Sequence, residues 1–525
     1  MTRDAVSLLG VALVCAGAAL VGGNFGETLG RPGRVTSSDV VTEETGRFRQ
    51  ALDLIQQNFA DPVDPEAALY HGAIPGMLAR LDPHSQFFDP ERFERLREEQ
   101  RGEYAGVGMQ IRLFRNDPIV DFPFPGTPAF RAGVRPGDVI QTIDGIPTSG
   151  LDVDEVARRV RGRPGTSVRL ALSRGGGVGR LDVALERDEI IRPTIPISFE
   201  LQPGVGYLRI TSFGQTTGTE LHKALDDFSK HELRGLVIDL RDNPGGLLQA
   251  SVDVAGSFLE PGAAIVSHRG RNERRQRYRA PMGGSPPSYP ITVLVNCRSA
   301  SASEIVAGAL QDHDRALIVG SNTFGKGLVQ SIYTLPSAAG LTLTTARYYT
   351  PSGRQIQRDW EGLSRDAYYA DPCESTFEPQ HSELRHTTSG RTVYGGGGIA
   401  PDVYMPEQGL TEVQRRWLDE RVFARFAETL DTRTLSHAWR PDRATLDSFQ
   451  SYLVRESPET AGYYPDNQTF VRRYLAGRVL TAAFDVDLGA RAEAEADPMI
   501  QSAAARLDEA ARLLNKRPSA VARAD

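Results

Sequence analysis

The sequence predicts a multidomain α/β protein, and three observations lead to that prediction. At 525 residues, the chain is longer than one hydrophobic core ordinarily supports, so two to four domains are expected. Apolar runs typical of strands alternate with helical patterns from about residue 205 to residue 330, which indicates a mixed sheet covered by helices. A glycine-rich, β-like stretch precedes that region, and patterns with helical spacing lie at both ends of the chain.

Composition excludes some classes of function. Hydrophobic residues make up 40% of the chain and charged residues 24%, and the formal net charge of −7 gives no electrostatic case for nucleic-acid binding. The three cysteines, Cys15, Cys297 and Cys373, match neither a metal-ligand pattern nor a disulfide framework. We interpret Cys297 as a buried structural thiol, and a Cys297–Cys373 bridge stays open as the alternative. No metal and no organic cofactor is implied.

Residues 1–30 are predicted to be a signal sequence or a membrane anchor. From Ala5 to Gly23 every residue except Ser7 is apolar or small, and the run is nearly long enough to span a membrane as a helix. Ala16-Gly17-Ala18 is also a possible cleavage site. We favour an uncleaved anchor that leaves the rest of the chain on the periplasmic side of a bacterial inner membrane. Secretion after signal cleavage is the alternative.

Two regions precede the predicted core. Residues 31–101 form a polar linker and a helical region, with one helical stripe from Phe48 to Phe59 and a second helix over Pro65–Leu81. Residues 102–188 have strand and turn signals, starting with a glycine-interrupted strand. A short amphipathic helix over Val153–Arg161 and a closing hairpin complete this β-rich region.

Residues 189–405 form the predicted core, whose second half contains a serine cluster. A buried strand over Thr292–Val295 leads into Ser301-Ala302-Ser303-Glu304, which has capping-box spacing and begins a helix. At a helix N-terminus the free backbone N–H groups and the helix dipole favour negative charge, as on an oxyanion.

A glycine-flanked lysine follows the serine cluster. At a period of two, Lys326, Leu328 and Gln330 share one face of the next strand. Burial could lower the pKa of Lys326 enough for it to act as a base, with Gln330 orienting its amine. Serine–lysine pairs are a known variant of nucleophile-plus-base chemistry. Taken singly, such a serine is usually only a helix cap, and such a lysine usually a surface or phosphate contact.

The combination is more specific than its parts. SASASEIVAGALQD followed by TFGKGLVQ closely resembles the active-site segment of carboxyl-terminal processing peptidases, also called tail-specific proteases. The resemblance implies Ser301 as the nucleophile, Lys326 as the base, Gln330 as its partner and a crotonase-like core of the ClpP/crotonase type. It also implies that the N–H of Gly245 or Gly246, in Asp242-Asn243-Pro244-Gly245-Gly246, forms the oxyanion hole together with the N–H of Ala302. An insertion over residues 358–397 departs from the family pattern.

The β-rich region of residues 102–188 resembles a PDZ domain of the protease-associated type. Such a domain takes an extended peptide as an added strand and holds its terminal carboxylate on loop N–H groups. The resemblance places that loop at Ala105, Gly106, Val107, Gly108 and Met109, whose small residues let backbone N–H groups converge on an anion. The segment Leu81-Asp82-Pro83-His84-Ser85 resembles the family's pre-PDZ helical region, so His84 is interpreted as structural.

The last region, residues 406–525, shows four helical stripes, and Trp417, Phe423 and Phe426 are interpreted as core residues. The whole predicts a serine endopeptidase that recognises apolar C-terminal tails of proteins and processes or degrades exported proteins. It would bind no nucleic acid, meet the membrane through its N-terminal segment, and form a homodimer or use an adaptor. The alternative is a non-catalytic PDZ scaffold or chaperone of the cell envelope.

Overall fold

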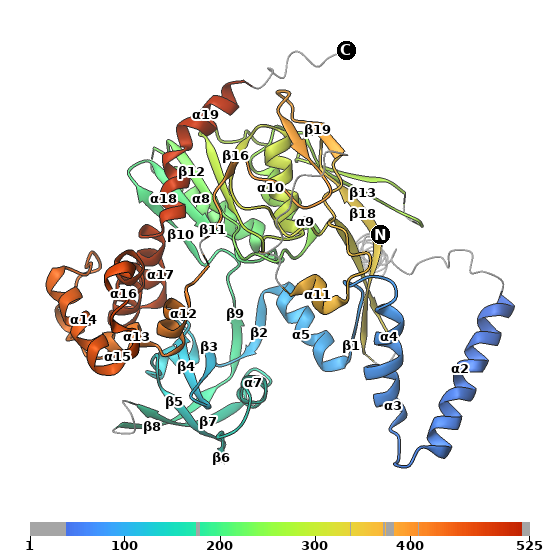
Figure 1. The fold of residues 1–525 in the computed structure, drawn as a ribbon, viewed down its shortest axis with the longest axis horizontal. Helices are drawn as coiled ribbons and strands as arrows, with labels where there is room; N and C mark the ends of the chain where they lie inside the picture. Colours follow the sequence, from blue (N-terminus) through green and yellow to red (C-terminus); the bar gives the residue numbers. More distant parts are fainter. Residues whose placement is uncertain are drawn as a thin grey trace, which may run out of the picture. The chain divides into compact units, whose positions relative to one another are not determined.

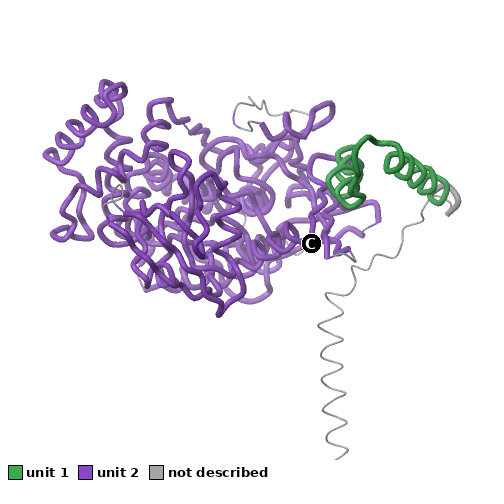
Figure 2. Tube along the Cα trace, turned by 90° about the horizontal axis from the view of Figure 1, so that it is seen from below, with its two compact units in different colours: residues 1–80 green, residues 81–525 purple. Residues whose placement is uncertain are grey.

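The structure is a computed structural model (Figure 1). It describes residues 38–174, 179–230, 232–272, 274–335, 338–370, 373, 383–407 and 409–516. The predicted anchor of residues 1–30 lies outside them. Within the described residues, no helix combines the length and the apolar character that crossing a membrane requires. The chain divides into two compact units, Met1–Arg80 and Leu81–Asp525 (Figure 2).

The first unit is helical in the residues that the structure describes. Its elements are α2 (Ser38–Asn58), α3 (Pro65–Ala67), a π-helical turn η1 (Ala68–Ala73) and α4 (Ile74–Leu78). Asp64 begins the second helical stretch by accepting the N–H of Glu66 at 2.9 Å, and Pro65 occupies the first turn, where no N–H partner is needed. The helix expected over Pro65–Leu81 therefore forms, but with a π-turn within it.

The second unit is built on a six-stranded sheet. The strands, in spatial order, are β10 (Ile197–Gln202), β11 (Val205–Arg209), β12 (Gly235–Asp239), β15 (Ile291–Val295), β16 (Ala316–Gly320) and β21 (Val403–Tyr404). All neighbours are parallel except β10 and β11, which are antiparallel. Parallel sheets are normally covered on both faces, which requires helices from elsewhere in the chain.

Helices from distant parts of the sequence cover the two faces of this sheet (Figure 1). One face packs against α8 (Thr217–Ser229), α9 (Leu248–Gly256) and α10 (Ala302–Asp312), and the other against α18 (Pro498–Ala505) and α19 (Leu507–Asn515). Strand β12 shows the alternation, since Leu236 and Ile238 join the first cluster and Val237 the second. The last described helices of the chain therefore complete the core.

A second sheet lies beside the core and brings the segment after His84 to the strand that contains Gln330. Lys326 lies in the loop before that strand, so the prediction that it shares a strand face with Leu328 and Gln330 is wrong. Its strands are β1 (Gln86–Phe88), β18 (Gly340–Tyr349), β13 (Ala264–Gly270), β14 (Gln276–Arg279) and β17 (Leu328–Thr334). Both β1 and β17 pair with β18, with Gln86 opposite Thr342 and Gln330 opposite Thr344.

The β-rich region forms a separate sheet. Helix α5 (Pro90–Arg101) leads into it, and its elements are β3 (Met109–Phe114), β4 (Asp117–Pro123), α6 (Pro128–Arg131), β5 (Val139–Ile143), β6 (Ile146–Pro147), α7 (Val153–Val160), β7 (Ser167–Arg174) and β8 (Gly179–Glu186). The ribbon of β2 (Glu103–Gly106) and β9 (Asp188–Ile191) joins its start and end. The predicted short helix and closing hairpin are both present.

The C-terminal region is helical and has its own apolar cluster. Its elements are α12 (Glu412–Asp419), α13 (Val422–Ala427), η3 (Thr432–Thr434), α14 (Arg443–Glu456), α15 (Pro458–Ala461), η4 (Pro465–Asn467), α16 (Gln468–Ala483) and α17 (Val486–Glu495). Trp417, Phe423 and Phe426 are buried in this cluster, as interpreted from the sequence. The insertion contributes α11 (Arg365–Tyr369), β19 (Leu384–His386) and β20 (Thr392–Tyr394).

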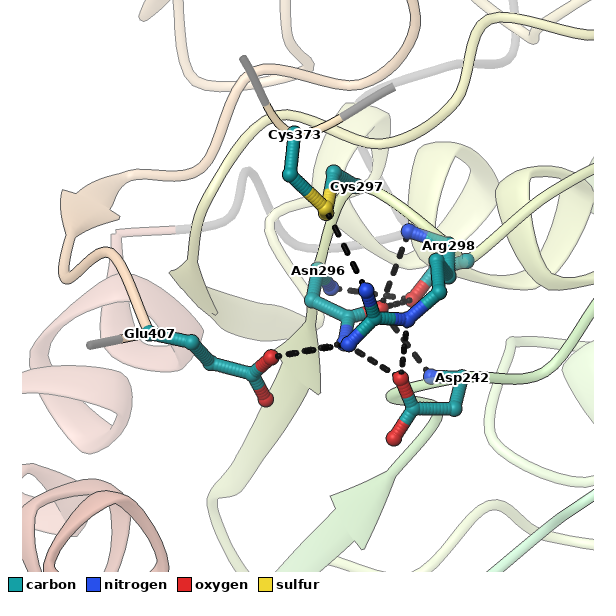
Figure 3. The surroundings of a disulfide bond; sticks show 7 residues. Asp242, Asn296, Cys297, Arg298, Cys373 and Glu407 are labelled. Atoms are coloured by element: carbon teal, nitrogen blue, oxygen red, sulfur yellow. Dashed lines mark hydrogen bonds and ion pairs between the residues drawn. A yellow bond between two sulfur atoms is a disulfide. The ribbon is translucent and has the colours of Figure 1, made fainter. Parts of the chain in front are cut away.

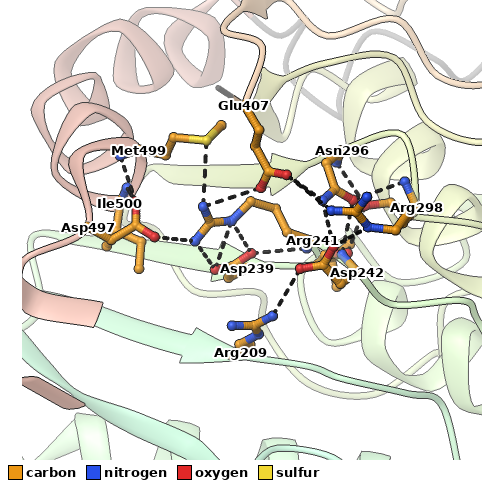
Figure 4. A network of polar contacts seen from close by, with 12 residues as sticks. Arg209, Asp239, Arg241, Asp242, Asn296, Arg298, Glu407, Asp497, Met499 and Ile500 are labelled. Atoms are coloured by element: carbon orange, nitrogen blue, oxygen red, sulfur yellow. Dashed lines mark hydrogen bonds and ion pairs between the residues drawn. The ribbon is translucent and has the colours of Figure 1, made fainter. Parts of the chain in front are cut away.

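A buried ionic network joins the C-terminal helices to the core sheet (Figure 4). The Arg241 guanidinium contacts the carboxylates of Asp239 at 2.7 Å and Asp497 at 3.1 Å, and Asp497 begins α18. Burial is the largest single influence and acts to raise the pKa of Asp239, but the charge and hydrogen bonds of Arg241, together with the charge of Arg209, outweigh it and the pKa is lowered. Moving α18 away from the sheet would separate these partners and leave an uncompensated buried charge. The network therefore fixes α18 to the core.

Cys297 and Cys373 form a disulfide, with Cα atoms 5.1 Å apart (Figure 3). The interpretation of Cys297 as a free buried thiol is therefore wrong, and the alternative bridge is present. Arg298, beside the bridge, pairs with Asp242 at 2.7 Å and with Glu407 at 3.6 Å. The bond anchors the insertion to the loop that precedes the serine cluster.

Candidate active site

Of the three serines in the cluster, only Ser301 has an unusual backbone. It is the N-cap residue of α10 with φ of 55°, a region that non-glycine residues rarely occupy. The other two hydroxyls hold backbone groups: Ser299 Oγ donates to Leu240 O at 2.8 Å, and Ser303 Oγ donates to Asn243 O at 3.0 Å. Ser299 and Ser303 are fully buried, whereas Ser301 is half-buried. Strained backbone that the surroundings enforce is common at functional sites.

The buried carboxylate of Glu304 connects Ser301 to Lys326. Its Oε2 accepts the N–H of Ser301 at 2.7 Å and the N–H of Lys326 at 2.9 Å, so the backbones of the two residues lie side by side. Its Oε1 accepts from Thr323 Oγ1 at 2.6 Å and from the N–H of Gly325 at 2.7 Å. Burial raises the pKa of the Glu304 carboxyl, and these hydrogen bonds oppose that change. Glu304 thus serves both as the predicted helix cap and as the link between the two loops.

A second link is the hydroxyl of Tyr348. It donates to the carbonyl oxygen of Lys326 at 2.6 Å and lies 3.1 Å from the carbonyl oxygen of Ser301. Burial raises the pKa of Tyr348 well above its usual value, and the Glu304 charge adds to that change. The hydroxyl therefore keeps its proton and remains a donor.

Lys326 has the environment that a base requires. Burial lowers the pKa of its amine, whereas the charges of Glu304 and Asp82 oppose that change. Lys326 Nζ donates to Gln330 Oε1 at 2.9 Å, and Gln330 Nε2 donates to the carbonyl oxygen of His84 at 2.6 Å. The second bond fixes which end of the Gln330 amide faces Lys326, because an amide nitrogen cannot accept the lysine proton.

Two of the predicted oxyanion donors have backbones directly beside Ser301. A methyl group on Gly245 would lie 2.8 Å from Ser301 Cβ and 3.0 Å from Ala302 N, so glycine is required there. The Gly245 N–H donates to Asn243 Oδ1 at 2.9 Å. On either side of Gly246, the carbonyl oxygen of Gly245 and the N–H of Leu247 each form a backbone hydrogen bond with Phe213. Ala302 is the first residue of α10, where backbone N–H groups have no partner within the helix.

His84 lies in this site, although its sequence context suggested only a structural role. Its side chain is 1% exposed, and its ring meets those of Trp360, Tyr368 and Tyr369 edge to face. Burial lowers the pKa of His84 to about 4, and the charge of Lys326 acts in the same direction. The imidazole is therefore neutral at physiological pH.

The predicted carboxylate loop, Ala105–Met109, is shorter in the structure: Ala105 and Gly106 end β2, Met109 begins β3, and Val107 and Gly108 lie between them. The carbonyl oxygens of Val107 and Gly108 accept the N–H groups of Ala129 and Phe124, both at 2.9 Å. A side chain on Gly108, whose φ is 77°, would collide with Thr127 at 2.3 Å. The close packing explains the glycine and fixes the course of the loop.

Comparison with known proteins identifies the family of the chain. Family models match the chain over residues 204–368 (peptidase family S41), 124–174 (PDZ domain) and 26–92 (activating protease CtpB N-terminal domain). A carboxy-terminal-processing protease of Bartonella bacilliformis is 38% identical over 384 residues, which cover 71% of this chain and 86% of that protein. The chain belongs to peptidase family S41. The predicted family, and with it a serine peptidase that contains a PDZ domain, is thereby confirmed.

Other S41 peptidases are also similar to this one. The carboxy-terminal processing protease CtpB of Bacillus subtilis is 32% identical over 354 residues, 67% of this chain and 73% of that protein. A solved photosystem II D1 C-terminal processing protease is 30% identical and covers 71% of this chain and 94% of its own, with a TM-score of 0.37.

Sequence reasoning about this S41 peptidase named Ser301, Lys326 and Gln330 but missed residues that hold them. Glu304 was recognised only as the fourth residue of a capping box. Its pairing with Gly325 and Lys326 depends on a loop from elsewhere in the chain, which local spacing does not reveal. No motif in the sequence marks Tyr348, which lies on β18. The Asp82-Pro83-His84-Ser85 segment resembles the family, but the resemblance does not show that the backbone carbonyl of His84 contacts Gln330.

Replacing Glu304 by glutamine is expected to destabilise this S41 peptidase and to lower its activity. Glutamine has one acceptor oxygen, and its NH₂ group would face backbone donors that the carboxylate now satisfies. The loss should be at least about 2 kcal/mol of unfolding free energy, since hydrogen bonds to a buried charge are involved. Thermal unfolding and peptidase rates should be compared with those of Glu412→Gln, an exposed glutamate on α12. Wild-type stability and rate for Glu304→Gln would contradict the role of Glu304 as the link.

Proposed function

We propose that this chain is a serine endopeptidase that selects proteins by their C-terminal tails through the PDZ domain and cleaves them with a Ser301–Lys326 dyad. The observation that carries the proposal is the single oxygen of Glu304 that accepts the N–H groups of both residues, with Lys326 buried beside Gln330. A nucleophile at a helix start and an amine of lowered pKa are the parts that acyl transfer needs. The core is proposed to be of the crotonase type.

In the proposed reaction, Ser301 Oγ attacks the peptide carbonyl while Lys326 Nζ takes the hydroxyl proton. Lys326 then returns that proton to the leaving amine as the peptide C–N bond breaks and an acyl-enzyme forms. Water, deprotonated by Lys326, then attacks the ester; the bond from the acyl carbon to Ser301 Oγ breaks, Lys326 returns the proton to Ser301 Oγ, and the acid product leaves. Gln330 keeps the amine oriented without adding charge.

The oxyanion of the tetrahedral intermediate would be bound by backbone N–H groups. We propose the N–H of Ala302 as one donor and that of Gly246 as the other, because the Gly245 N–H already donates to Asn243. Preorganised donors of this kind each contribute roughly 10²- to 10³-fold in rate. Gly245, which packs against Ser301, would then position the turn, and its own N–H would not bind the oxyanion.

The substrates are proteins, and we propose that those with free, apolar C-termini are preferred. The chain would be held at, or exported across, a bacterial inner membrane, and a homodimer or an adaptor stays a prediction. The Cys297–Cys373 disulfide supports an oxidising compartment. The test is degradation of an unfolded test protein with an apolar tail by the wild type and by Ser301→Ala. Binding without cleavage by both proteins would favour a scaffold instead.

Tail recognition predicts that amidation of the substrate's C-terminus weakens binding. If Ala105–Met109 bind the carboxylate, these charge-assisted contacts are worth about 1.5–3 kcal/mol. Amidation should then raise Kd by roughly ten- to a hundredfold. The measurement is a titration of the full-length Ser301→Ala protein with matched free-acid and amide peptides. Equal affinities would exclude tail recognition while leaving the dyad untouched.

A further inference from the structure

The insertion reaches the candidate active site through one helix. Helix α11 begins at Ser364, whose side chain caps it, and ends at Tyr369. Tyr368 is buried in a cluster with Phe324 and Ala300, residues from the two loops that contain Lys326 and Ser301. The disulfide anchors the insertion a second time, at Cys373.

Tyr369 contacts His84 by a hydrogen bond. Its hydroxyl lies 2.6 Å from His84 Nδ1, and burial raises the pKa of Tyr369 to about 12, so the hydroxyl keeps its proton. A neutral imidazole with a protonated partner at Nδ1 accepts there and carries its own proton on Nε2. Tyr369 is 39% exposed, and its ring packs on His84, Phe324 and Tyr368, so a phenylalanine there keeps the packing and loses only the hydroxyl.

The backbone of His84 is fixed from the other side. Asp82 Oδ1 accepts the N–H groups of His84 and Ser85, both at 2.7 Å. Ser85 Oγ in turn accepts the N–H of Thr344 on β18 at 3.2 Å. The turn and the tyrosine together hold the His84 carbonyl where it accepts from Gln330.

We propose that His84 is a positioning residue for Lys326, and that the insertion holds it there through Tyr369. The contacts run from the Tyr369 hydroxyl to the His84 ring, and from the His84 carbonyl through the Gln330 amide to Lys326 Nζ. A shift of the carbonyl frees the amide to rotate, and its oxygen then no longer faces the amine. This inference rests on the proposed role of Lys326 as the base.

Tyr369→Phe, which removes only the hydroxyl, tests the proposal. Steady-state cleavage of a peptide should show kcat lowered roughly tenfold and KM unchanged, because misplacement of a catalytic group affects the chemical step. The rising limb of the pH profile should move toward the pKa of an ordinary lysine, since a loosened amine admits water. The control is Tyr404→Phe on β21, which removes a hydroxyl from a tyrosine that is 69% exposed, and which should keep wild-type kcat and pH profile.

Substitutions of His84 distinguish its two ring nitrogens. His84→Asn retains an acceptor near the position of Nδ1 and should recover much of the activity that His84→Ala loses. His84→Gln places its amide near the position of Nε2, which is buried without a partner among the described residues. Recovery by glutamine and not by asparagine would overturn the proposal, because Nε2 would then be the important group.

Two outcomes separate this inference from the proposed function. If Tyr369→Phe matches Tyr404→Phe in kcat and in pH profile while Lys326→Arg is inactive, the positioning role is wrong and the dyad stands. Full activity of Lys326→Arg would overturn the dyad, and this inference with it. Thermal unfolding of each variant checks that the fold is intact.

Discussion

Replacing Ser301 by alanine is expected to remove peptidase activity and leave the fold intact. Loss of the nucleophile in other serine peptidases costs on the order of 10⁶ in kcat. Because the Ser301 N–H still donates to Glu304 in the variant, the helix start keeps its cap. Alanine at this position must adopt the same positive φ as serine. The variant should therefore lose at most about 1 kcal/mol of unfolding free energy, the usual contribution of a capping side chain. Rates of peptide cleavage and the thermal unfolding midpoint are the measurements.

Ser303→Ala is the matched control for that experiment. It removes a hydroxyl two residues away on the same helix, one that donates to Asn243 O at 3.0 Å. The variant should lose about 1 kcal/mol of stability and retain most of its activity. An inactive Ser303→Ala beside an active Ser301→Ala would mean that the wrong nucleophile has been named.

The second large effect is expected from Lys326→Arg, which should be nearly as inactive as Lys326→Ala. Arginine keeps the positive charge but does not deprotonate in proteins, so it cannot act as a base. A positioned general base contributes roughly 10²- to 10⁴-fold, and a loss of that size is expected. Lys223→Arg on α8 is the control and should be fully active.

The pH dependence of the wild type tests the same role. Lysine is an effective base only when it is unprotonated, so kcat/KM should rise with pH. The midpoint should lie below about 10.4, the ordinary pKa of lysine, because burial lowers the pKa of Lys326. His84, with a pKa of about 4, is neutral throughout that rise. A rate independent of pH, or a fully active arginine variant, would mean that Lys326 only binds charge.

Much of this fold could be predicted from local patterns. Strands such as Ile291–Val295 are continuous apolar runs, and helix α10 follows a capping box that the structure contains. The serine and the lysine were named because they belong to two short motifs of a known family. Local periodicity and turn chemistry were sufficient in these cases because the residues involved are neighbours in the sequence.

The rest depends on contacts between distant segments. Nothing in the pattern of Pro498–Asn515 shows that these helices cover the second face of the core sheet. Likewise, the disulfide joins residues whose sequence separation is 76, and spacing alone does not distinguish it from two free thiols. His84 reaches Gln330 through a backbone carbonyl, a group that every residue has. Such contacts follow from the tertiary fold, because no local propensity encodes them.

The Cys297–Cys373 bond closes the chain into a covalent ring. That ring contains Ser301, Lys326, Gln330 and Tyr369, and a loop of this size contributes about 4.5 kcal/mol in the chain-entropy description of disulfides. A peptidase is exposed to cleavage by its own copies. A single nick anywhere inside the ring would leave both fragments linked, with Ser301 and Lys326 still in one molecule. Only a nicked chain that is also reduced could separate them.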